Sequence, residues 1–144
     1  MKYEYKTQPF RHQERVFNRS KSLRHYAFFL EMGTGKSKVT VDTMSYLYES
    51  GKIDTVLIVA PKGVYENWIK NEIPKHMPDR IEPLVVKWQP NFTKTFKEQM
   101  HQVATRSKRK DEKLHVLVMN VEALSTRKGI EVGTYYLSQN PDNL

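Results

Sequence analysis

The chain has 144 residues, of which 38% are hydrophobic and 28% are charged, and its net charge is +8. This composition excludes a disordered chain, and the length allows one domain with a substantial core but not two. The absence of cysteine excludes disulfides and thiolate metal sites, and no apolar run approaches the ~18 residues of a membrane span. The charged N-terminus is not typical of a secretory signal, so we expect a cytoplasmic protein whose partner is nucleic acid rather than a membrane.

Helical and strand patterns alternate along the first half of the chain. A proline followed by apolar residues at helical spacing predicts a helix over 9–22, and the apolar run 26–31 predicts a buried strand. Residues 36–50 again have helical spacing and end before a glycine, which is typical of a helix C-terminus. The continuous apolar run 54–61 predicts a strand covered on both faces, and residues 63–73 predict a helix that the next residue, a proline, stops.

The same alternation continues to the end. A strand is expected at 83–88, and a helix over 91–107 with Asn91 as its N-cap. Another buried strand is expected within 113–124, and a last helix over 129–140. Strands that alternate with helices predict an α/β fold with a mainly parallel sheet.

The stretch "YAFFLEMGTGKS", residues 26–37, places a glycine-rich turn between an expected strand and an expected helix. Gly33 and Gly35 leave backbone N–H groups open to a phosphate and allow positive φ angles, and the helix N-terminus adds partial positive charge. Lys36 can then reach the outer phosphates, and Ser37 can offer its hydroxyl to Mg²⁺. The pattern therefore predicts a phosphate loop for a nucleoside triphosphate.

Four blocks resemble superfamily two helicases and translocases, and within them the Snf-type branch. "LEMGTGKS" is similar to their phosphate loop, in which the first glycine is commonly absent, and Leu30 stands at that position here. "PFRHQERVF" is similar to the Q-motif region, "LIVAPKGVYENWIKNEI" to motif Ia, and "HVLVMNVEAL" to the block that follows. The blocks come in the family's order, so the resemblance implies a RecA-like, three-layer α/β/α fold and the ATP-binding portion of an ATP-dependent DNA helicase or translocase.

The resemblance also implies residue roles. Gln13 would hydrogen-bond the adenine edge, since a carboxamide both donates and accepts. ATP and Mg²⁺ would be held by the loop, with Lys36 as the catalytic lysine and Ser37 toward the metal; the nucleotide-binding residues are Gln13, Gly33, Thr34, Gly35, Lys36 and Ser37. Nucleic-acid phosphates, of DNA more than RNA, would be met after two core strands by Pro61, Lys62, Gly63, Asn120 and Val121.

In the family an Asp-Glu pair follows a later apolar strand and serves Mg²⁺ and water. The only Asp-Glu pair of this sequence, Asp111–Glu112, lies in a basic segment before an expected strand and not after one. We therefore expect residues 1–144 to be the N-terminal part of a helicase ATP-binding lobe, with a Q-motif-like region at 1–24 and a partial RecA-like core at 25–144. Such a part would be inactive by itself, in contrast to its full-length helicase or translocase.

Two other functions fit the residues less well. One is a different P-loop ATPase or a kinase, and the other is a non-catalytic nucleic-acid-binding module with a vestigial phosphate loop. The apolar strand expected at 26–31 would lack its neighbours in an incomplete sheet, so we also expect self-association of the chain.

Overall fold

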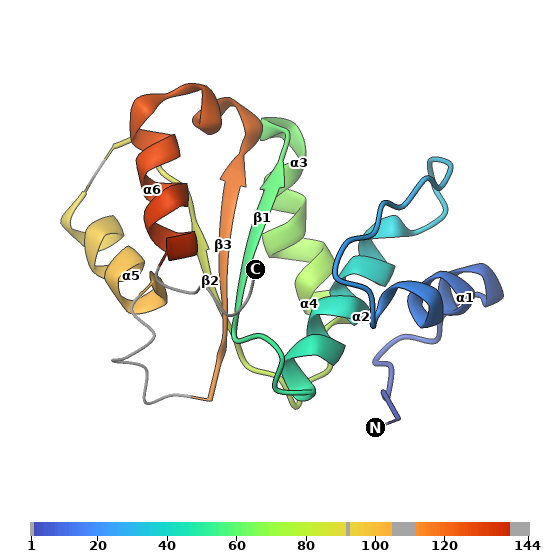
Figure 1. Cartoon of the computed structure of the whole chain (residues 1–144). Coiled ribbons are helices and arrows are strands. Elements are labelled where there is room, and N and C mark those ends of the chain that lie inside the picture. Colours follow the sequence, from blue (N-terminus) through green and yellow to red (C-terminus); the bar gives the residue numbers. More distant parts are fainter. Residues whose placement is uncertain (1, 92, 105–111, 139–144) are drawn as a thin grey trace.

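A three-stranded parallel sheet forms the centre of the molecule (Figure 1). The computed structural model describes residues 2–91, 93–104 and 112–138. The strands are β1 (Thr55–Ala60), β2 (Pro83–Lys87) and β3 (Leu114–Asn120), in the spatial order β1-β3-β2. The last strand in sequence therefore lies in the middle, and six of its seven residues are buried, as expected for a continuous apolar run. The predicted α/β class and these three strands are confirmed.

One face of the sheet is covered by α5 (Lys94–Ala104) and α6 (Arg127–Ser138). A short 3-10 helix, Val121–Ser125, leads from β3 into α6. This layer packs on the sheet through one apolar cluster, whose buried members are Val86, Trp88, Phe96, Met100, Leu117, Met119, Ala123 and Tyr136.

The opposite face is covered by α2 (Lys36–Glu49), α3 (Lys62–Asn67) and α4 (Ile73–His76), so the fold has three layers (Figure 1). This second cluster includes Val41, Met44 and Ile73 from the helices and the side chains of β1 and β3 that point to that face. The alternation of side chains along β3 supplies both clusters, which explains why the whole strand is apolar.

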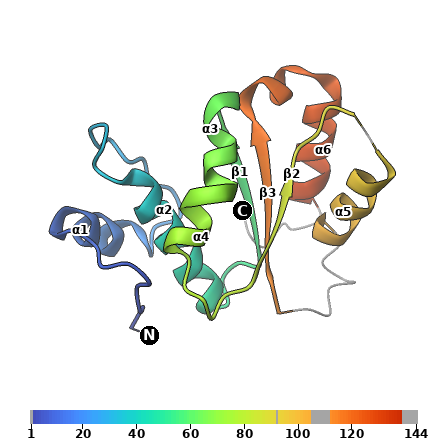
Figure 2. The same ribbon diagram turned by 180° about the vertical axis from the view of Figure 1, so that it is seen from behind.

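Helix α1 (Arg11–Ser20) lies beyond α2, away from the sheet, as Figures 1 and 2 both show. Phe17 packs there against Tyr3 and Val39. In the same interface the ammonium of Lys38 lies 2.7 Å from the carboxylate of Asp42, and both side chains are buried. The N-terminal region is thus fixed to the outer side of α2.

Residues 26–31 do not form the strand that their apolar run predicts. They have no regular secondary structure, and Phe29 is 95% exposed. An apolar run becomes a strand only where a neighbouring edge supplies hydrogen bonds and cover, and in the described part of the chain no strand lies beside this segment.

Two expected helix boundaries also differ. The helix over 63–73 does not stop at Pro74, because the π-helical turn Trp68–Glu72 precedes α4 and the proline lies in the first turn of α4. Proline has no N–H group to donate to a helical carbonyl. The wider π-helical turn changes the hydrogen-bond pattern before Pro74, so the chain stays helical there. Helix α5 begins later than expected, and its first turn is capped by Thr93, whose Oγ1 accepts from the N–H of Phe96 at 3.1 Å, rather than by Asn91.

Within the described residues, no helix combines the length and apolar character that crossing a membrane requires.

Candidate functional site

The glycine-rich turn before α2 has the backbone conformation that its sequence predicts. Gly33 and Gly35 both have a φ of 76°, and helix α2 begins immediately after them at Lys36. The hydroxyl of Thr34 donates to the carbonyl of Glu31 at 2.6 Å and closes the turn on itself. Left-handed glycines on both sides of one residue form the kind of backbone concavity that receives an anion.

Lys36 and Ser37 lie in the first turn of α2, and both are half-buried. The Nζ of Lys36 donates to the carbonyl of Leu30 at 2.8 Å. This bond holds the ammonium group beside the start of the turn. A bound phosphate would compete with that carbonyl for the ammonium, and a charged acceptor forms the stronger hydrogen bond.

Gln13 and His12 fix the turn to helix α1. The Gln13 amide Nε2 donates to the carbonyl of Thr34 at 3.1 Å, and its Oε1 accepts from the backbone N–H of Phe10 at 2.9 Å. The Nε2 of His12 lies 2.9 Å from the same Thr34 carbonyl. Gln13 is only 4% exposed, so its expected contact with adenine would require the residues that cover it to move aside.

A second hollow, of about 400 Å³, lies where the three parallel strands end at their carboxyl sides. In parallel α/β sheets ligands bind at this edge. This carboxyl-end pocket brings together two of the residues expected to meet nucleic acid, Lys62 after β1 and Asn120 at the end of β3. The other residues in its wall are Tyr65, Trp88, Pro90, Glu122, Ala123, Thr126 and Lys128.

The remaining residues expected to meet nucleic acid adjoin this pocket without lining it. Pro61 is the N-cap of α3, Gly63 lies in its first turn, and Val121 begins the 3-10 helix with its side chain half exposed. Asn120 also caps that helix, since its Oδ1 accepts from the N–H of Ala123 at 2.7 Å. Its carboxamide nitrogen is the group that can still donate to a ligand.

The sequence patterns did not identify Trp88 and Lys128 as neighbours of Lys62. Trp88 directly follows β2 and Lys128 lies at the start of α6, so only the order of the strands in the sheet places them together. The pocket carries two lysines and one glutamate, which suits an anion. Among the residues that the structure describes there is no group of three His, Asp or Glu side chains that could hold a metal ion.

Comparison with known proteins agrees with this geometry. The profile of the family described as "Type III restriction enzyme, res subunit" matches residues 6–143. The chain belongs to this family. A comparison with curated proteins found no match. Membership places the chain in the helicase-like superfamily, as an ATP-binding region with a RecA-like fold. The glycine-rich turn before α2 and the carboxyl-end pocket both lie within the matched residues.

Proposed function

We propose that this chain is the ATP-binding portion of a Snf-type, ATP-dependent DNA helicase or translocase. The turn from Gly33 to Ser37 holds the nucleotide phosphates, and Ser37 supplies a hydroxyl to the accompanying Mg²⁺. The four sequence blocks support the Snf-type branch, and the family membership supports the helicase-like superfamily.

The single observation that carries the proposal is the pair of left-handed glycines before α2, with Lys36 as the first residue of that helix. Backbone N–H groups, helix N-terminus and ammonium converge on one concavity. Other turns with positive φ in the described residues lack this combination, since Gly51 follows the C-terminus of α2 and has no lysine and helix start after it.

The carboxyl-end pocket is proposed to bind the nucleic-acid backbone. Lys62, Lys128 and the Asn120 carboxamide supply donors to phosphate oxygens, and no arrangement for reading bases is evident in the same wall. Such binding is independent of sequence, and DNA is preferred here because of the resemblance to Snf-type translocases.

Calorimetric titration with a non-hydrolysable ATP analogue, with and without Mg²⁺, tests the nucleotide site. Lys36→Ala removes the charge from a site that holds a polyanion, so we expect at least a tenfold loss of affinity, about 1.4 kcal/mol. Lys52→Ala is the matched control, because this exposed lysine follows the other end of α2. Equal affinity for the wild type and Lys36→Ala would refute the assignment.

ATP turnover by this chain alone is proposed to be negligible. None of the three described strands ends in an Asp-Glu pair: β1 runs into Pro61, β2 into Trp88, and β3 ends at Asn120. Phosphate release in the presence of DNA at rates near 1 s⁻¹, ordinary for an enzyme, would contradict this. Nucleotide binding without turnover would separate the proposal from a module with a vestigial loop, which would not bind nucleotide.

A further inference from the structure

Strand β1 has one unpaired edge in the part of the chain that the structure describes, because the sheet order is β1-β3-β2. The N–H of His115 on β3 donates to the carbonyl of Asp54 at 3.0 Å. This bond shows which residues of β1 direct their backbone groups toward β3. Alternate residues of a strand direct their backbone groups to the same side. The N–H and C=O groups of Thr55, Leu57 and Val59 therefore point away from β3, toward the open edge.

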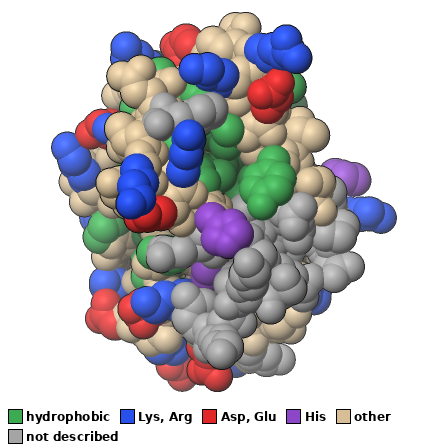
Figure 3. Space-filling model, turned by 90° about the vertical axis from the view of Figure 1, so that its left-hand side faces the viewer, with side chains coloured by type: hydrophobic (Ala, Val, Ile, Leu, Met, Phe, Trp, Pro, Cys, Tyr) green, Lys and Arg blue, Asp and Glu red, His purple; other side chains and the backbone are tan. Residues whose placement is uncertain are grey.

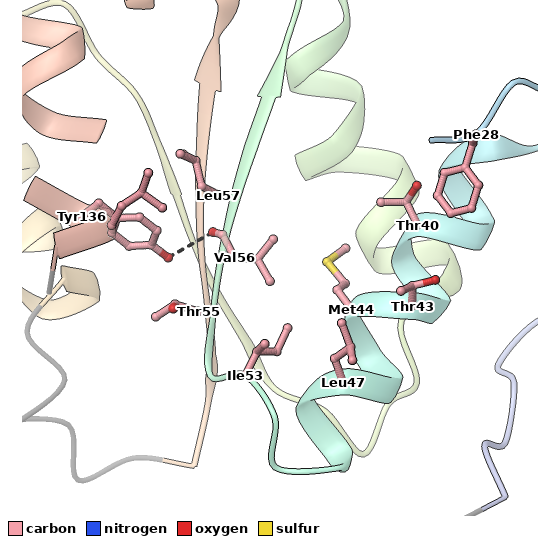
Figure 4. A pocket seen from close by; sticks show the side chains of 11 residues that line it. Phe28, Thr40, Thr43, Met44, Leu47, Ile53, Thr55, Val56, Leu57 and Tyr136 are labelled. Atoms are coloured by element: carbon pink, nitrogen blue, oxygen red, sulfur yellow. Dashed lines mark hydrogen bonds between the residues drawn. The ribbon is translucent and has the colours of Figure 1, made fainter. Parts of the chain in front are cut away.

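An apolar groove of about 430 Å³ runs along this edge, and Figure 4 shows its walls. We call it the β1-edge groove. Helix α2 overhangs it from one layer and the end of α6 from the other, so a fourth strand would be covered on both faces. The hydroxyl of Tyr136 donates to the carbonyl of Val56 at 3.0 Å and ties α6 to the strand. The residues that line the groove include Phe28, Met44, Leu47, Thr55, Leu57 and Leu137.

Among the described residues, no charged side chain lines the β1-edge groove, although the chain has a net charge of +8. Proteins usually protect an open strand edge with charge, proline or a covering loop. The shallower groove between α5 and α6 differs in this respect, since Lys97 and His101 line it, and Figure 3 shows that face with basic side chains and a histidine around its exposed hydrophobic ones. The edge of β1 is thus built to accept an uncharged strand.

A segment with the matching chemistry lies exposed on the same molecule. Along residues 27–31 burial alternates, with Phe28 and Leu30 half-buried and the residues between them exposed, which is the pattern of an edge strand without a partner. Phe29 is 95% exposed and Met32 is 94% exposed. Two large apolar side chains exposed to this degree within four residues suit an interaction surface.

This segment does not pair with β1 of its own chain, although its Phe28 lines one wall of the β1-edge groove. Phe28 packs toward the α1–α2 interface, and the carbonyl of Leu30 accepts from Lys36 at 2.8 Å. Phe29 consequently points outward, where a second molecule can reach it.

We propose that residues 26–31 of one copy of this chain add as a fourth strand to the β1 edge of a second copy. Phe29 then enters the β1-edge groove, and the backbone of the segment pairs with Thr55, Leu57 and Val59. A reciprocal exchange closes a two-fold dimer, since each copy carries both the segment and the groove. Strand addition of this kind combines main-chain hydrogen bonds with burial of alternate side chains.

Light scattering over a concentration series tests the association. We expect twice the mass of one chain at high concentration, and added salt strengthens the dimer because it screens repulsion between two chains of charge +8. Phe29→Glu raises the dissociation constant at least about tenfold, since a carboxylate does not enter an uncharged groove. Ile130 is an α6 residue that is 51% exposed, so Ile130→Glu is the matched control and should leave the dissociation constant unchanged. A monomer at every concentration overturns the proposal.

The absence of cysteine allows a direct test of which surfaces meet. Ala27→Cys chains mixed with Leu57→Cys chains are expected to give a disulfide-linked heterodimer under mild oxidation, and more of it than either variant gives alone. A Leu57–Leu57 dimer as the main product would mean that two β1 edges pair instead, and a bond within the double variant's own chain would mean that the segment fills its own groove. Either result overturns the proposal, and neither depends on nucleotide binding.

Discussion

Gln13 and Gly35 are in contact across the interface between α1 and the glycine-rich turn before α2. A Cβ atom built on Gly35 would lie 2.2 Å from the Nε2 of Gln13. Gly35 is therefore required twice, for its φ of 76° and for the space that Gln13 occupies. Gly33 has the same φ, but nothing lies within 4 Å of its added Cβ.

This difference predicts unequal effects of two like substitutions. Gly33→Ala should lower the free energy of unfolding by about 1–2 kcal/mol, the cost of a left-handed alanine. Gly35→Ala should cost about 1 kcal/mol more, since it also displaces the Gln13 hydrogen bond to Thr34. Denaturant unfolding measures both. In the Gln13→Ala background the two substitutions should lower the free energy of unfolding by the same amount. A difference that persists there would contradict the contact between Gln13 and Gly35.

His76 predicts a pH dependence of stability. Its pKa lies below 6.5, chiefly because it is buried and also because Lys38 is near, with Lys75 and Lys6 adding to the effect and Glu72 opposing it. The unfolded chain therefore takes up this proton at a higher pH than the folded chain. The free energy of unfolding should fall as the pH drops below 6.5 and level off below the folded pKa.

The measurement is denaturant unfolding of the wild type and His76→Gln between pH 7 and pH 5. The Gln variant keeps a polar group near the Thr7 hydroxyl, which lies 2.7 Å from the His76 Nδ1, but cannot titrate. Its stability should depend less on pH than that of the wild type. Parallel curves would mean that other groups, such as carboxylates, cause the whole slope.

At the scale of elements, α6 approaches the 3-10 helix closely at one glycine. A Cβ on Gly129 would lie 1.9 Å from the backbone carbonyl of Ala123, whereas one on Gly133 would meet the Met119 sulfur at 3.8 Å, an ordinary contact. Gly129→Ala should destabilise the fold by about 1–3 kcal/mol or more, because backbone must move. Gly133→Ala should be neutral or stabilising by about 0.5–1 kcal/mol. Thermal unfolding that ranks the two in the reverse order would contradict this packing.

The elements also show what a sequence predicts and what it does not. Apolar runs predict β1, β2 and β3, and the run of β1 also predicts cover on both faces, which the sheet provides. Residues 26–31 are also an apolar run, but within the described residues no strand lies beside them, and composition cannot reveal that. Gly33 and Gly35 have the expected positive φ because the requirement is local. Gln13 faces Thr34, and Lys62 faces Trp88, only through tertiary packing, which no spacing encodes.

At the scale of the whole molecule, the net charge of +8 predicts salt-sensitive binding to nucleic acid. If about four phosphates are contacted, the logarithm of the binding constant should fall with the logarithm of salt concentration at a slope of roughly −3 to −4. Lys62→Ala and Lys128→Ala should each make that slope shallower by about 0.9 and affect all sequences equally. Fluorescence anisotropy with unrelated DNA duplexes measures this. A salt-independent, sequence-selective complex would contradict it.

The central position of β3 has a consequence for how the chain is made. In the part of the chain that the structure describes, β1 and β2 do not pair with each other. Both pair with β3, beginning with Thr55 opposite His115. A ribosome releases the chain from its N-terminus, so the segments of β1 and β2 emerge before β3, the strand with which both of them pair, has been synthesised. The sheet closes only after Asn120 has left the exit tunnel. A nascent chain stalled before Leu114 would present both strands unpaired, as a substrate for chaperones.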